Sequence, residues 1–202
     1  MCLSQFFGHM SPFDLIVAIV AVVTAVYTFY KSFIEKARLA LYPADRLNLV
    51  IGSGGGSRWI NLHANLVNHA VKTGVLHRLE ATMIDPSGAT FLYHWRLFFE
   101  YLPGAQAVQP QSAPHPISVP GRSSYLLSVQ LELGAQGSTP PWMSGRYQLR
   151  LLGWVNRPNR SRSPNLSSVF HFQIDTSQSQ ELSTATPVAP VMLEVPVAEW
   201  AT

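Results

Sequence analysis

The sequence predicts a mainly β protein: an immunoglobulin-like or fibronectin-like antiparallel sandwich of about seven strands, preceded by one N-terminal transmembrane helix. Three observations support this prediction. An apolar run with a single charge occupies residues 13–30. From Arg46 to Asp175 apolar and polar residues alternate with a period of two, which is typical of strands. No helical pattern of ten residues separates these runs, so parallel βαβ folds are excluded.

The apolar run predicts a transmembrane helix over residues 13–34, after a short N-terminal segment over 1–12. A helix that crosses a bilayer needs about 20 mostly apolar residues. Residues 15–30 supply most of them, and Phe33 and Ile34 extend the run. In lipid the segment must satisfy its own backbone hydrogen bonds, so we expect a helix despite many β-branched residues. A cleaved signal peptide is the alternative, but no Lys or Arg precedes the run and no A-x-A site follows it.

Basic residues set the expected orientation. No Lys or Arg precedes the apolar run, whereas four follow it by position 46. Because such residues favour the cytoplasmic side, we expect the N-terminus outside and the C-terminal domain in the cytoplasm. The helix is expected to continue over 35–43 as an amphipathic juxtamembrane helix beside anionic headgroups, until Pro43 ends it. The residues expected at the membrane interface are Tyr27, Tyr30, Lys31, Phe33, Lys36 and Arg38.

Seven alternating segments make up the expected β-sandwich domain, residues 44–175. They are 47–51, 59–68, 75–84, 89–101, 123–133, 146–155 and 168–175. A Greek-key barrel is the alternative arrangement of such strands. Tyr147 follows a turn, at a place where sandwiches often carry a tyrosine corner. Residues 176–202 contain three prolines and lack strand periodicity, so we expect a tail that is either solvated or docked on a partner or on the domain.

Catalytic and metal-binding patterns are absent from the sequence. There is no G-x-S-x-G or Walker motif, and the eleven acidic residues are dispersed, so we expect no enzyme and no cofactor. The net charge of +3 is scattered, which argues against a nucleic-acid partner. The single cysteine, Cys2, lies outside the domain and allows no intramolecular disulfide, which suits a reducing compartment. His63 and His77, expected on adjacent strands, form the best candidate metal pair, but metal sites usually need three or four ligands.

Residues 65–88, NLVNHAVKTGVLHRLEATMIDPSG, form a strand–turn–strand pattern. This segment resembles bacterial single-pass membrane proteins that carry an Ig-like β-sandwich and have no assigned activity. The resemblance extends in pattern over residues 47–175. It implies the architecture and the membrane location, and it carries no catalytic residue.

These observations predict a membrane-anchored, non-catalytic binding or adaptor protein at the cytoplasmic face. Its expected partners are membrane lipid and a protein of unknown identity; the oligomeric state is not predicted. The candidate contacts to a partner or to anionic lipid are Arg157, Arg160 and Arg162 in one loop and Trp200 in the tail. The alternative is an envelope assembly factor in the periplasm, or a protein like a metal chaperone, with the opposite topology. The chain lacks the cysteine motif that membrane-anchored copper chaperones use.

Overall fold

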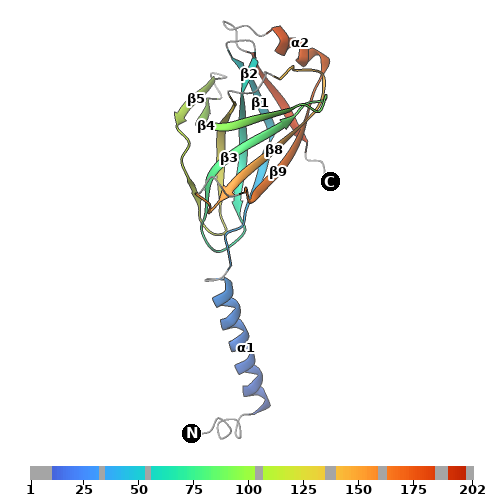
Figure 1. Ribbon diagram of the computed structural model, residues 1–202. Helices are drawn as coiled ribbons and strands as arrows, with labels where there is room; N and C mark the ends of the chain where they lie inside the picture. The colour runs from blue at the N-terminus through green and yellow to red at the C-terminus, as the bar shows by residue number, and fades with distance from the viewer. Residues whose placement is uncertain are drawn as a thin grey trace.

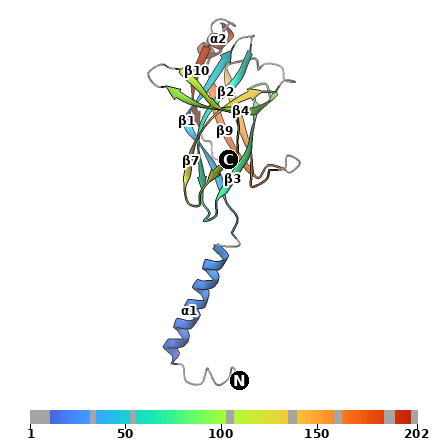
Figure 2. The same ribbon diagram turned by 90° about the vertical axis from the view of Figure 1, so that its left-hand side faces the viewer.

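The computed structural model shows an apolar helix that projects from one end of a β domain (Figures 1 and 2). It describes residues 11–31, 35–52, 56–102, 107–134, 140–158, 163–184 and 191–198. The N-terminal helix and the short C-terminal helix lie at opposite ends of the β domain in both views. The two ends of the β domain therefore have different surroundings.

The helix α1 spans Pro12–Phe29. Ser11 caps its N-terminus: the Ser11 hydroxyl accepts a hydrogen bond from the Asp14 amide, and the Asp14 carboxylate accepts one from the Ser11 amide. The one charge of the apolar run thus has a structural role. The mean hydropathy of the 18 residues is 2.1 and none of their side chains is buried. By length and composition α1 is able to cross a membrane, although a signal sequence near an N-terminus has the same properties.

The β domain contains ten strands and one further helix in its described part. They are β1 (Leu39–Gly52), β2 (Gly56–Asn68), β3 (Gly74–Ile84), β4 (Thr90–Leu102), β5 (Ala107–Ser112), β6 (Ile117–Val119), β7 (Ser124–Leu133), β8 (Gly145–Val155), β9 (Leu166–Ile174), α2 (Thr176–Thr184) and β10 (Val191–Ala198).

Eight of these strands close into an antiparallel barrel, so the predicted Ig-like or fibronectin-like sandwich is wrong. The ring runs β1–β2–β7–β4–β3–β8–β9–β10 and returns to β1. The strands β5 and β6 extend it beside β4 and β3. The neighbouring strands β2, β7, β4 and β3 form a Greek key. β3 and β4 are joined by a hairpin and β4 lies beside β7, whereas β2, which precedes β3 in the chain, lies on the far side of β7. Alternation along a strand defines its inner face, but it does not decide whether the sheet closes.

The barrel interior is a single apolar core to which all eight strands contribute. Tyr93 and Tyr147 are its largest fully buried side chains. The Tyr147 hydroxyl accepts a hydrogen bond from the Met143 amide (2.9 Å) and donates one to the Met143 carbonyl (3.0 Å). This side-chain-to-backbone contact matches the predicted tyrosine corner, although it lies in a barrel. Burial raises the pKa of Tyr147 to about 12.

Two predicted segments differ in the structure. The expected helix over 35–43 is wrong, because β1 begins at Leu39 and pairs with β2 from Leu39↔Asn68 to Pro43↔Ala64. A bulge follows Pro43. Proline has no backbone N–H to donate to the sheet, and bulges are among the places in a sheet where it is tolerated. The expected tail over 176–202 instead supplies α2 and β10. The Leu182 side chain of α2 and the Val195 side chain of β10 are buried in the core cluster.

We predict that Val195→Ala lowers the free energy of unfolding by about 2 kcal/mol, because a buried Val contributes about that much. The control is Glu194→Gln in the same strand, which points outward and is expected to change stability by less than about 1 kcal/mol. Urea unfolding of the full chain in detergent, followed by circular dichroism, measures both. Equal, negligible effects of the two substitutions would contradict the closure of the barrel by β10.

Candidate binding site at the fork of two strands

The barrel wall has a fork where β3 and β4 separate. These strands pair only from Glu80↔His94 to Ile84↔Thr90. Before Glu80, β3 turns to β6 and pairs with it through Leu76↔Ile117. Beyond His94, β4 pairs on this side with β5. Among the pairings of the described chain, residues 77–79 have no strand partner on the fork side, so a stretch of backbone faces the opening there.

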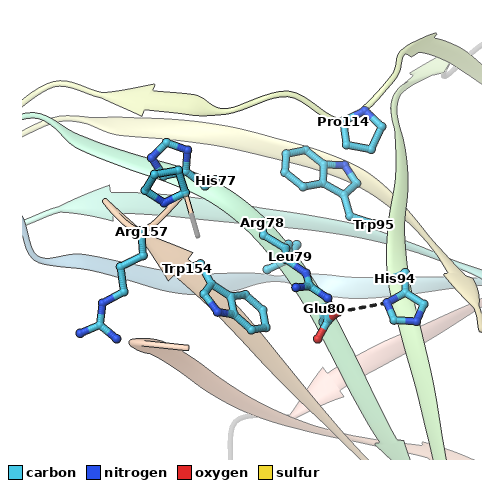
Figure 3. Close-up of a pocket in the computed structure, with 10 residues that line it drawn as sticks. His77, Arg78, Leu79, Glu80, His94, Trp95, Pro114, Trp154 and Arg157 are labelled. Carbon is cyan, nitrogen blue, oxygen red and sulfur yellow. Dashed lines mark hydrogen bonds and ion pairs between the residues drawn. The ribbon is translucent and has the colours of Figure 1, made fainter. Parts of the chain in front are cut away.

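A hollow of about 530 Å³ occupies this fork. Its floor is β3, and β4, β8 and the connection between β5 and β6 form its sides, as Figure 3 shows. The lining residues are His77, Arg78, Leu79, Glu80, His94, Trp95, Pro114, Trp154, Arg157 and Pro158. Basic and aromatic side chains dominate this lining, and Glu80 is its single acid.

A bulge in β3 explains why several polar side chains reach this hollow. The register between β3 and β8 shifts between Leu76 and Arg78, so that His77 and Arg78 are both only partly buried. Leu79 then points into the core, and Arg78 and Glu80 lie two residues apart on the same outer face. That spacing brings the Arg78 guanidinium onto the Glu80 carboxylate as an ion pair.

Cross-strand neighbours complete the charged cluster. The His94 Nδ1 atom lies 3.1 Å from the Glu80 carboxylate, as expected for directly paired residues (Figure 3). On the other side Arg78 is paired with Trp154, and its guanidinium lies 4.7 Å from the centre of the indole ring. Glu80 has 12% of its side chain exposed and Arg78 33%. The cation is therefore held in place by a carboxylate and an aromatic face, while part of it stays open to solvent.

Two further groups lie at the edge of the hollow. The Arg157 guanidinium donates a hydrogen bond to the Ser163 carbonyl (2.9 Å), which joins the segment directly after β8 to the segment before β9. The Trp95 Nε1 atom is buried and has no hydrogen-bond partner among the described residues. Trp95 packs edge-on against Phe98, with 4.8 Å between the ring centres. The cluster thus offers guanidinium, imidazole and indole groups beside an open strand edge, which suits recognition of a negatively charged, extended ligand.

The structure gives different outcomes for the predicted contact residues. Arg157 lines the hollow, but Arg160, Arg162 and Trp200 lie outside the described residues. Among the predicted interface residues, Tyr27 belongs to α1 and Tyr30 and Lys31 directly follow it. Lys36 and Arg38 are exposed in the segment before β1, and Phe33 lies outside the described residues.

The expected neighbourhood of His63 and His77 is wrong, because β2 and β3 are not paired in the barrel. The His63 Nδ1 atom instead lies 2.9 Å from the Ser128 hydroxyl, and burial lowers the pKa of His63. Within the described ranges no three His, Cys, Asp or Glu side chains come together as a metal-binding group. His77 belongs to the hollow at the fork.

The sequence reasoning missed Arg78, Glu80, His94 and Trp154. The pattern Arg78–Leu79–Glu80 contains a usable signal, because two opposite charges that flank a buried residue must share the outer face of a strand. The partner strands were not predictable from spacing alone, since β8 is far from β3 in the sequence.

No family model and no curated protein matches this chain. The resemblance to bacterial membrane-tethered proteins therefore stays a prediction. The Ig-like architecture that it implied is wrong, because the strands close into a barrel.

We predict a measurable coupling between Arg78 and Glu80 in a double-mutant cycle built from Arg78→Gln and Glu80→Gln. The expected coupling is about 1 kcal/mol, because the carboxylate is largely buried. The matched control is the cycle for Arg96 and Glu132, whose side chains are both 39% exposed at 3.6 Å. For that pair we expect less than about 0.5 kcal/mol. Urea unfolding of the four variants of each pair measures both terms; a larger coupling in the control would contradict the preorganised cluster.

Proposed function

We propose that this protein is a membrane-tethered, non-catalytic adaptor that binds an acidic, extended segment of a partner protein at the fork. The helix α1 serves as the anchor and the barrel presents the hollow. The observation that carries the proposal is the juxtaposition of a held guanidinium, Arg78, with the open strand edge at residues 77–79.

An open strand edge favours a peptide over a compact ligand. Added strands gain main-chain hydrogen bonds from such an edge, and pockets beside it select alternate side chains. At the fork, Arg78 and Arg157 offer donors to carboxylates, and Trp95 offers an apolar surface to the side chains between them. The partial exposure of Arg78 matters here, since a guanidinium fully enclosed by Glu80 would have no donors left.

The orientation rests on the distribution of basic residues. Four Lys or Arg residues follow the apolar run by position 46 and none precedes it. This bias supports an outward N-terminus and a cytoplasmic barrel. The partner is then a cytoplasmic or membrane protein with an acidic segment, and α1 restricts the search for it to the membrane surface.

The test uses the full chain in nanodiscs of phosphatidylcholine and two synthetic peptides, one alternating Glu with Val and one alternating Lys with Val. We expect the Glu peptide to bind, to perturb tryptophan fluorescence and to bind more weakly at high salt. We expect Arg78→Gln to weaken it about tenfold, because a charge-assisted hydrogen bond contributes roughly 1.5 kcal/mol.

Arg150→Gln is the matched control, since Arg150 is exposed on β8 and does not line the hollow. It is expected to leave the affinity unchanged. Binding of both peptides alike, absence of binding by the Glu peptide, or equal effects of the two arginine substitutions would each overturn the proposal.

A further inference from the structure

The end of the barrel next to α1 differs from the rest of its surface. A second hollow, of about 280 Å³, lies between α1 and the barrel and is lined by Tyr27, Thr28, Lys31, Val71, Gly121 and Arg122. The loop between β2 and β3 and the turn between β6 and β7 therefore lie beside the C-terminal end of the apolar helix. We call the surface formed by residues 36–38, 69–73 and 120–126 the collar.

Cations gather on and around the collar. Lys36, Arg38, Lys72 and Arg122 are exposed on it, and Lys31 lies beside it. Among the described residues of this region the only acid is Glu35, which pairs with Lys31 at 2.7 Å. The opposite end of the barrel, by contrast, exposes the acids Asp175 and Glu181 around α2.

Exposed apolar side chains share this location. Five large apolar residues are exposed in the described part of the barrel: Tyr42, Val71, Leu92, Tyr125 and Leu126. Four of them, all except Leu92, lie on the collar or directly above it. Tyr42 of β1 and Leu126 of β7 are both paired with Asn65 of β2, so they lie on either side of Asn65 on neighbouring strands. Leu126 is 64% exposed. An exposed cluster of aliphatic and aromatic side chains among cations is typical of surfaces that meet lipid headgroups.

The collar is also held rigidly. The buried side chain of Asn68 donates hydrogen bonds from Nδ2 to the carbonyls of Lys72 (2.8 Å) and Val119 (3.0 Å), and its Oδ1 atom accepts one from the Ala70 backbone amide (3.1 Å). The Arg122 amide donates to the Ala70 carbonyl at 2.9 Å. The loop and the turn approach so closely that a Cβ atom at Gly121 would lie 1.7 Å from the Val71 carbonyl oxygen.

The tether between helix and barrel is short. Seven residues separate Lys31 from Leu39, the start of β1, and the eight residue steps between them span at most about 28 Å when fully extended. The collar therefore stays close to any bilayer that α1 crosses. The tether thus gives the collar a high effective concentration at the bilayer surface, and weak contacts are then enough to hold the collar on the bilayer.

We infer that the collar docks on a bilayer surface rich in anionic phospholipid, with a lipid phosphate seated between Lys31 and Arg122. This inference rests on the anchoring role of α1 in the proposed function, but not on the acidic peptide. Docking orients the barrel with its collar toward the membrane. The fork then lies close to the headgroups, because β3 begins at Gly74, directly after the collar, and reaches the hollow at residues 77–80.

The test uses the full chain with Cys2→Ser in nanodiscs of phosphatidylcholine, with and without phosphatidylglycerol. A fluorophore is attached at Ser124→Cys, on the collar, or at Gln173→Cys, at the opposite end of the barrel. A spin-labelled lipid in the disc quenches fluorophores that lie near the headgroups. We expect strong quenching at Ser124→Cys that increases with phosphatidylglycerol, and little quenching at Gln173→Cys under either condition.

Two charge-matched variants separate docking from general attraction. Lys36→Gln, Arg38→Gln and Arg122→Asn together neutralise the collar; Asn suits position 122, where φ is 55°. Arg96→Gln, Arg146→Gln and Arg150→Gln remove the same charge elsewhere on the barrel. We expect the first triple variant alone to lose the effect of phosphatidylglycerol.

The two proposals fail in different ways. Equal quenching in both triple variants, in chains that co-elute with the discs, would overturn docking and leave the anchor intact. Failure of the chain to co-elute with discs of either composition would overturn the anchor, and docking with it.

Discussion

Closure of the sheet is the constraint on which the rest of the structure depends. The ring exists because β10 inserts between β1 and β9, and both of these strands would otherwise end the sheet with unpaired backbone groups. Pairing from Arg46↔Pro196 to Ile51↔Val191 brings the C-terminal part of the chain back to the first strand. With these edges closed, the openings of the wall lie where pairing is interrupted, and the fork between β3 and β4 is such a place.

Closure also gives the molecule two distinct ends. Antiparallel strands return to the same two rims, so loops far apart in sequence meet there. The loop after β2 and the turn before β7 meet the apolar helix at one rim, and α2 lies at the other (Figure 1). The fork opens in the wall near the rim beside α1, between Arg157 and the ion pair of Arg78 and Glu80. The apolar helix, the cationic collar and the hollow at the fork therefore follow one another along a single axis.

Much of this architecture was predictable from periodicity. The alternation over 59–68, 75–84 and 146–155 predicted β2, β3 and β8 to within a few residues. The prediction failed at β10. Residues 176–202 as a whole lack strand periodicity and contain three prolines, but within them Val191, Leu193, Val195 and Val197 do alternate. In the structure Pro196 pairs at the end of the β1 ladder, and β9 joins only from Val197 onward. Without β10 the remaining strands suggested two open sheets.

The site was less predictable than the fold. Arg157 was a candidate because of the basic loop around it. Arg78 and His94, by contrast, become a site only through the register of the strands. β3 must pair with both β4 and β8, and the bulge after Leu76 must turn Arg78 outward. These are long-range facts that a single sequence does not contain. The apolar helix, by contrast, was evident because its length and composition are local properties.

The anchoring role of α1 is the central claim, and the single cysteine of the chain tests it directly. A membrane-impermeant maleimide is applied to intact cells and, in parallel, to permeabilised cells. The protein is then isolated from all fractions, and its mass and its labelling are determined. A retained helix with an outward N-terminus predicts labelling of Cys2 in both samples. Labelling only after permeabilisation would contradict the orientation. A chain that has lost Cys2 together with the apolar run would contradict the anchor itself.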